Sequence, residues 1–194
     1  TVLVSLGLQG KPSWSPPSVK DNRILTFGKW GNAKDPEPVI HAFLRREIEG
    51  QLVVGGGPTP ERKGFVERLR RNYASEKVIF TGYVPESDIP NLFHSANLVV
   101  LQYKENPGNS AVLLQVCQYG RVPVIRRLPT LEQMVGDLGL IAYFYNTEEE
   151  LGELLQVLLS DKDSLVEAGW HNYCQVQHLT MDKVSEVYWR LLEE

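Results

Sequence analysis

Residues 98–125 read LVVLQYKENPGNSAVLLQVCQYGRVPVI, and the fold prediction starts from the pattern in this stretch. It opens with an apolar run at 98–101 that is typical of a buried strand, and it closes with another at 122–125. Between them lie a polar loop and about three turns of helix-compatible sequence that stop at Gly120. Strand, loop, helix and strand in this order predict a βαβ unit of a parallel sheet.

The polar loop of this unit has the features of an anion site. Asn109 or Ser110 can cap the following helix, which leaves backbone N–H groups free at its start. Helix starts at the carboxyl ends of parallel strands are where open α/β sheets bind anions, above all phosphates. The stretch therefore predicts a phosphate-binding loop, provided that neighbouring loops supply matching ligands.

The same alternation extends along most of the chain. Further strands are expected at 23–28, 51–54, 77–81 and 140–144, and further helices at 36–48, 61–73, 88–96, 131–135, 148–159, 163–177 and 182–192. Short strands that are each followed by a helix predict an α/β fold, a Rossmann-like doubly wound parallel sheet with helices on both faces. The order of the strands in the sheet is left open.

The segment before the first clear strand, residues 1–22, has a different character. It contains Pro12, Pro16 and Pro17, which is typical of a linker or a surface excursion. We therefore expect an interdomain connection at 1–22 and one domain at 23–194. Thr1 is neither a Met nor the start of a basic signal peptide, so we expect the chain to be cut from a longer protein.

Composition and charge count against several functional classes. A net charge of −4 gives no electrostatic case for binding nucleic acid or an anionic membrane. Cys117 and Cys174 are too few for a disulfide framework and lie in helix-like apolar settings, which favours a reduced compartment and plain packing. No apolar run approaches the length of a membrane span.

The familiar sequence patterns of several enzyme classes are missing. Residues 28–31 have the wrong spacing for a dinucleotide fingerprint, and neither a Walker loop nor a Gly-x-Ser-x-Gly elbow occurs. The four histidines, at positions 41, 94, 171 and 178, lack the spacing of metal ligands. We therefore expect no metal site.

Several strand-end loops remain as candidate ligands. Lys29 and Lys34 flank the first of them and can hold a diphosphate together with the helix start near Ser110; composition alone favours two solvated lysines. The glycines at 55–57 fit a tight turn better than a phosphate loop. Two alternatives stay open: residues 82–84 are a wall for a flat base or an ordinary turn, and residues 126–127 face an anion or a solvated edge.

Taken in order, these loops resemble the C-terminal, donor-binding half of a GT-B retaining glycosyltransferase of the group 1, family 4-like type. The matches are residues 27–34 with the family's Gly-Arg/Lys…Lys element, 52–58 with its strand-Gly-x-Gly-Pro turn, 78–84 with its Val-x-Phe-x-Gly element, 92–101 with its Leu-x-x-x-Tyr-x-x-Ala-Asp lead, and 113–125 with its Glu-Ala-x-Ala-x-Gly-x-Pro-Val-Val element. Each match is weak, but their common order is specific.

The resemblance implies a set of donor-binding residues. Lys29 and Lys34 would grip the donor diphosphate, and residues 82–84 would lie against the nucleotide base. The complete implied set is Gly28, Lys29, Lys34, Gly82, Tyr83, Val84, Gly108, Asn109, Ser110, Ala111 and Gln115. It further implies a nucleoside-diphosphate sugar as substrate, with no metal and no other cofactor.

The opening stretch is also where this chain departs from the family. The family pattern carries two glutamates eight positions apart, one contacting the transferred sugar and one the ribose hydroxyls. Here the first falls on Pro107 and the second on Gln115. Glu105 is the candidate catalytic carboxylate by a different loop path, the alternative being a solvated loop residue. The Gly-Gly turn expected after the last strand of the motif is replaced by Leu128 and Pro129.

Two functions follow as hypotheses. The resemblance implies a cytoplasmic enzyme that moves a sugar from its nucleotide carrier to a glycan, lipid or small molecule with retention. Its N-terminal acceptor domain, and any peripheral membrane contact through that domain, would be absent here, which would leave the isolated chain inactive. The alternative is a catalytically degenerate binding or scaffolding module. An epimerase of the same architecture would need a carboxylate and histidine site for which no residues match.

Overall fold

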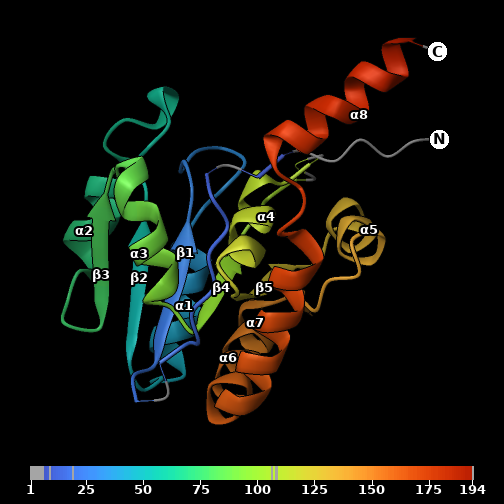
Figure 1. The fold of residues 1–194 in the computed structure, drawn as a ribbon. Coiled ribbons are helices and arrows are strands. Elements are labelled where there is room, and N and C mark those ends of the chain that lie inside the picture. Colours follow the sequence, from blue (N-terminus) through green and yellow to red (C-terminus); the bar gives the residue numbers. More distant parts are fainter. Residues whose placement is uncertain (1–6, 9, 19, 106, 108, 194) are drawn as a thin grey trace.

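The computed structural model describes residues 7–8, 10–18, 20–105, 107 and 109–193, with the backbone only of 187, 188 and 190–193 (Figure 1). Its six-stranded sheet has the order β3-β2-β1-β4-β5-β6, and every pairing is parallel. The strands are β1 (Arg23–Phe27), β2 (Gln51–Gly55), β3 (Val78–Gly82), β4 (Leu98–Leu101), β5 (Val122–Arg126) and β6 (Tyr143–Tyr145). The predicted fold class is confirmed.

The helices cover both faces of this sheet. They are α1 (Glu37–Arg45), α2 (Phe65–Tyr73), α3 (Ile89–His94), α4 (Ala111–Gln118), α5 (Pro129–Asp137), α6 (Glu148–Ser160), α7 (Lys162–Val176) and α8 (Met181–Glu193), with short 3-10 turns η1 (Pro60–Arg62) and η2 (Glu86–Asp88). Successive strand residues point to opposite faces, so the apolar strands supply two cores. One core packs Ile24 and Val100 with α1, α2 and α6, and the other packs Leu25 and Val99 with α3, α4 and α5.

Most expected elements differ by a few residues at their ends, and two of the differences have a clear physical cause. The predicted helix at 61–73 is a 3-10 turn followed by α2, which starts at Phe65 because Gly64 adopts a left-handed conformation with φ of 80°. The strand predicted at 140–144 is β6 instead, which starts three residues later and ends one residue later. The backbone N–H groups of Leu140 and Ile141 donate to Val135 O and to the Asn172 side chain, so neither residue pairs in the sheet.

Residues 10–18 form an extended segment, here called the strap, that packs on the domain. The amide of Ser13 donates to Gln118 O over 3.1 Å, which ties the strap to the end of α4. Trp14 lies edge-on to Trp170 of α7, with 5.1 Å between the ring centroids. The proline-rich composition indicated a linker or surface excursion, and these contacts hold the described part of that segment against the sheet domain.

Arg121 joins the strap to two elements of the sheet domain. Its side chain is fully buried, and its guanidinium donates to the carbonyls of Ser15, Phe93, His94 and Gly120 and to the Ser15 hydroxyl. Burial lowers the pKa of this arginine to about 10. No carboxylate of a described residue pairs with it, and its donors are satisfied by hydrogen bonds, mainly to backbone carbonyls.

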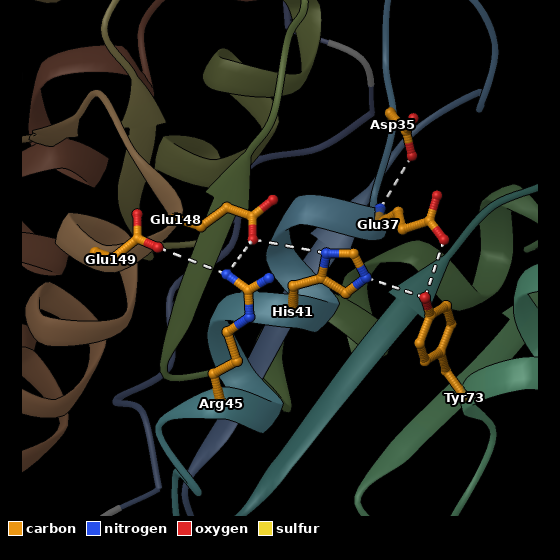
Figure 2. Close-up of polar contacts among 7 residues, drawn as sticks. All are labelled: Asp35, Glu37, His41, Arg45, Tyr73, Glu148 and Glu149. Atoms are coloured by element: carbon orange, nitrogen blue, oxygen red, sulfur yellow. Dashed lines mark hydrogen bonds and ion pairs between the residues drawn. The ribbon is translucent and has the colours of Figure 1, made fainter.

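A chain of polar contacts braces α1 against α2 and α6, as Figure 2 shows. The Tyr73 hydroxyl lies 3.0 Å from His41 Nε2 and donates to Glu37 over 3.0 Å. Glu148 lies 3.6 Å from the other ring nitrogen of His41 and 3.1 Å from Arg45. Burial, followed by the hydrogen bond with Glu37, raises the pKa of Tyr73. The network spans three helices and therefore fixes their packing.

Candidate functional site

The loops that follow β1 and β4 meet at one edge of the sheet. These strands are neighbours although the chain runs outward from β1 through β2 and β3 before it returns to β4, so they mark the point where the strand order reverses. Lys34 and Tyr103 form an isolated antiparallel bridge between the loops, and the Lys104 amide donates to Ala33 O over 2.9 Å. Open α/β sheets bind ligands at this position.

Lys34, Tyr103 and Ser110 form a connected group in this edge. The Lys34 ammonium lies over the Tyr103 ring, 4.5 Å from its centroid, and the Tyr103 hydroxyl lies 2.6 Å from Ser110 Oγ. A Cβ added to Gly28 would lie 3.3 Å from the Lys34 nitrogen, so a glycine lets this ammonium approach the end of β1. Lys34 lies 69 positions before Tyr103 and 76 before Ser110 in the sequence, and the fold brings them together.

Ser110 also starts helix α4. Its Oγ accepts a hydrogen bond from the Leu113 amide over 3.1 Å, which is the N-cap geometry expected from the sequence. The hydroxyl is thus engaged in the cap and with Tyr103, which leaves the first backbone N–H groups of the helix, at Ala111 and Val112, for a ligand. Asn109 is exposed, and Gly108 lies outside the described residues.

Polar contacts hold the loop after β4 from two sides. Asp35 lies 2.8 Å from the Lys104 ammonium and accepts from the Glu37 amide at the start of α1. On the other side, Arg126 donates to Tyr103 O over 3.0 Å. Arg126 is therefore a brace for the loop and not a solvated edge, whereas the neighbouring Arg127 pairs with Glu132 at the surface.

The glycine turn after β2 packs closely against the loops of the same edge. Gly56 has φ of 103°, and a Cβ there would lie 1.9 Å from Gly28 O. Its amide donates to Gly82 O over 2.9 Å. The glycine is therefore needed for close approach of neighbouring loops, which agrees with the tight-turn interpretation.

A pocket of about 620 Å³ lies along α4 beyond its start. It is lined by residues of the strap, of the η2–α3 segment and of α4, namely Gly10, Lys11, Glu86, Ser87, Ile89, Pro90, Gln115 and Tyr119. Gln115 follows Ala111 by one helical turn, about 6 Å along the axis. The pocket volume falls in the range of small-molecule sites.

The other predicted residues lie around this edge. Lys29 is exposed, as is Glu105 at the tip of the β4 loop. Gly82 ends the edge strand β3 with φ of 69°, and the Tyr83 side chain is 80% exposed. Val84 is half-buried, and residues 82–84 do not line the pocket, whose wall on this side starts at residue 86.

Sequence reasoning missed four residues that shape the site: Tyr103, Lys104, Lys11 and Glu86. Tyr103 and Lys104 stand directly after the β4 strand, where the carboxyl-edge rule applies to them as much as to Ser110. Lys11 carried no signal, because a lysine in a proline-rich segment looks solvated. Among the described residues, no group of three or more histidine, cysteine, aspartate or glutamate side chains is arranged to hold a metal ion.

His94 connects the strap to the helix that precedes β4. Its Nε2 lies 3.2 Å from Ser13 O and 3.3 Å from the Ser13 hydroxyl. Burial lowers the pKa of His94 below 6.5; the bond to Ser13 O acts in the opposite direction, and the Arg121 charge adds to the lowering. The folded state therefore favours a neutral imidazole.

This lowered pKa predicts a pH-dependent stability. The contribution of His94 is fully present above pH 6.5 and is lost as the pH falls through 6.5 towards the folded pKa, because the unfolded chain binds the proton first. We expect His94→Gln to flatten the change in urea midpoint between pH 7.5 and pH 5, and His178→Gln, at an exposed position, to leave it unchanged. Equal slopes in wild type and His94→Gln would contradict the assignment.

The chain matches the family described as Glycosyl transferases group 1 over residues 21–161. Among proteins similar in sequence, mannosylfructose-phosphate synthase of Agrobacterium fabrum is 30% identical over 94 residues, covering 43% of this chain and 21% of that protein. The putative glycosyltransferase YtcC of Bacillus subtilis is 28% identical over 102 residues, covering 45% and 24%. This chain therefore spans a quarter or less of either relative.

Solved structures share the fold. Anabaena HepE in complex with UDP and glucose has a TM-score of 0.77 at 15% identity, covering 91% of this chain and 49% of that one. The C-terminal domain of LpcC from Francisella tularensis, a glycosyl transferase group 1 family protein, has a TM-score of 0.67 at 18% identity, covering 82% and 87%. Sucrose-phosphate synthase of Thermosynechococcus elongatus has a TM-score of 0.74 at 19% identity, covering 91% and 47%.

These matches agree with the motif order read from the loops and with the parallel sheet that carries them. In the described part of the chain, no helix combines the length and the apolar character that crossing a membrane requires. The family match covers most of the chain, including every strand of the sheet. The chain belongs to the glycosyl transferases group 1 family and has the Rossmann-like fold of GT-B glycosyltransferases.

Proposed function

We propose that this chain binds the nucleoside diphosphate of a nucleotide sugar and forms the donor-binding half of a glycosyltransferase. The observation that carries the proposal is the meeting of Lys34, Tyr103 and Ser110 at the start of α4, where the strand order reverses. A diphosphate in this edge would meet an ammonium group and the free N–H groups of the helix. Both favour negative charge, the second through the helix dipole.

The ring of Tyr103 makes Lys34 a better-defined ligand. An exposed lysine loses rotamer entropy when it binds, but the contact with the ring already restrains the Lys34 side chain. Lys29, exposed on the same loop, adds a second cation that is free to follow the ligand. The donor-binding set is completed by Gly28, Asn109, Gly108, Ala111 and Gln115, with residues 82–84 beside the base. The proposal includes no metal and no other cofactor, since these cations and the helix start balance the diphosphate.

The complete reaction is a further part of the proposal. The intact protein would transfer the sugar to a glycan, lipid or small-molecule acceptor with retention, using an N-terminal acceptor domain and, through it, any contact with a membrane surface. Residues 1–22 would connect that domain to residues 23–194. The likeness to the LpcC C-terminal domain, which this chain matches over 87% of that structure's length, supports the division. A cytoplasmic location completes the proposal.

One observation favours a second candidate, a binding or scaffolding module without catalysis. Pro107 and Gln115 occupy the two positions where the family pattern has glutamates, and Glu105 is exposed on the loop tip. Proline offers no side-chain acceptor, and an amide binds ribose hydroxyls without charge assistance. A transfer assay with the intact protein and its Glu105→Gln variant separates the two. Loss of transfer in the variant supports the enzyme, and no transfer by the wild type supports the module.

The donor site is tested by titrating the chain with UDP, GDP and ADP in a calorimeter, and by repeating the titration with Lys34→Ala. We expect saturable binding of at least one nucleotide, weakened about tenfold or more by the substitution, since one charge-assisted contact is lost. Lys20→Ala, which removes an exposed lysine outside the site, is the matched control. No binding at millimolar concentrations, or equal losses in both variants, would overturn the proposal.

A further inference from the structure

The pocket along α4 carries two opposite charges on different elements. Glu86 lines it from η2, and Lys11 lines it from the strap. Neither side chain belongs to an ion pair among the described residues. An acid and a base that line one pocket without neutralising each other are available to a ligand that offers both donors and acceptors.

The strap holds Lys11 in place beside the pocket. Two residues after it, the Ser13 amide donates to Gln118 O, and Ser15 is held by the buried Arg121. The neighbouring Gly10 has φ of 80°, and a Cβ there would lie 3.8 Å from the Tyr119 hydroxyl, so the strap runs close to α4 at this point. The backbone that carries Lys11 is therefore held in place by hydrogen bonds to the domain.

The remaining lining suits a flat ring. Ile89 and Pro90 provide an apolar wall next to Glu86, and Tyr119, the residue that caps the end of α4, contributes an aromatic side chain. Gln115 lies between this end of the pocket and the helix start that would hold the phosphates. A nucleotide that places its diphosphate at Ala111 and its ribose at Gln115 would therefore carry its base towards Glu86 and Lys11.

The hydrogen-bonding edge of guanine matches this pair of charges. Its N1–H and N2–H₂ groups are adjacent donors, which the two oxygens of one carboxylate accept together, and its O6 is an acceptor for an ammonium group. Uracil offers a single N–H between two carbonyl groups. A carboxylate could accept from that N–H, but its second oxygen would face a carbonyl oxygen and be repelled. Adenine offers a ring-nitrogen acceptor beside its amino group, which leaves one carboxylate oxygen facing a lone pair.

We propose that Glu86 and Lys11 select guanine, and that the donor of this chain is a guanosine-diphosphate sugar. This inference rests on the proposed function, because it assigns the base of the nucleotide that the same site would hold. It adds two residues that the family motifs do not assign. It also separates this chain from Anabaena HepE, whose solved structures contain UDP.

The test compares GDP, UDP and ADP by calorimetry on the whole chain, its Glu86→Gln variant and its Lys11→Ala variant. We expect GDP to bind about tenfold more tightly than UDP and ADP, since a bidentate pair to a base edge discriminates by a factor of that order. Glu86→Gln should weaken GDP about tenfold and should strengthen UDP or leave it no weaker, because glutamine keeps the size but has one acceptor and no charge to repel the uracil carbonyls. Lys11→Ala should also reduce the preference for GDP over UDP and ADP, because the ammonium group that would donate to guanine O6 is lost.

Glu76→Gln and Lys20→Ala are the matched controls, since both residues are exposed and neither lines the pocket. Tighter binding of UDP or ADP than of GDP would overturn the guanine assignment and leave the donor site intact. An equal loss of all three nucleotides in Glu86→Gln would overturn it as well, because the carboxylate would then act without reading the base. If no nucleotide bound at millimolar concentrations, the result would contradict the proposed donor site itself and not only its choice of base.

Discussion

Arg121→Leu is expected to lower the free energy of unfolding by about 3–5 kcal/mol, because several buried acceptors lose their donor at once. The guanidinium serves carbonyls on the strap, on α3 and at the end of α4. Leucine keeps much of the apolar packing but donates nothing. The carbonyls of Phe93 and His94 would then be left without the donor that the guanidinium provides.

Arg127→Leu is the matched control for this change. Arg127 lies six residues further along the chain and pairs with Glu132 at the surface, with 47% of its side chain exposed. An exposed ion pair contributes at most about 1 kcal/mol. Urea unfolding gives the free energy of unfolding of both variants, which can be compared directly if the m-value, the slope of that free energy against urea concentration, is the same in each. A loss for Arg121→Leu no larger than that for Arg127→Leu would show that the strap is not held by this residue.

Tyr103→Ala is expected to have the second largest effect, acting on both stability and nucleotide binding. The Tyr103 side chain is 3% exposed, and removing a buried aromatic ring costs about 3–5 kcal/mol. The same change removes the ring beneath Lys34 and the hydroxyl beside Ser110. Lys34 would lose its preferred position, and affinity for a nucleoside diphosphate should fall together with stability.

Tyr103→Phe separates these two roles. Phenylalanine keeps the ring that carries the Lys34 ammonium and loses only the hydroxyl, so stability should fall by about 1 kcal/mol and nucleotide affinity should change little. Unfolding and calorimetric titration of both variants provide the comparison. If Tyr103→Phe weakened nucleotide binding as much as Tyr103→Ala, the ring contact would have no part in holding the lysine.

The fold could be predicted largely from the alternation of apolar strands and amphipathic helices. The 98–125 stretch gave its strand, loop, helix and second strand close to their observed bounds. Strand order stayed open, because pairing between β1 and β4 joins residues more than 70 positions apart and leaves no local pattern. The start of α2 was predicted too early, because the spacing of apolar residues does not show that Gly64 adopts a left-handed conformation just before the helix.

The site was predictable where it depends on strand-end loops. Lys34 and Ser110 were expected to converge, and they do so through Tyr103, whose position directly after β4 was the one signal that could have identified it. The strap was not predictable, because prolines in an extended segment look alike in a linker and in a packed wall. Arg121 belongs to a Gly-Arg-Val-Pro run that resembles a family motif, and nothing local shows that its charge is buried among carbonyls.

The proposed nucleoside-diphosphate site lies at the start of α4, between the loops after β1 and β4. Its most direct test is a titration of the ¹⁵N-labelled chain with GDP and with UDP, followed by NMR of the backbone amides. We expect the largest saturable shifts at Gly28, Ser110, Ala111 and Gln115. Shifts confined to the opposite edge of the sheet, around Glu47 and Gln156, or no saturable shift at all, would contradict it.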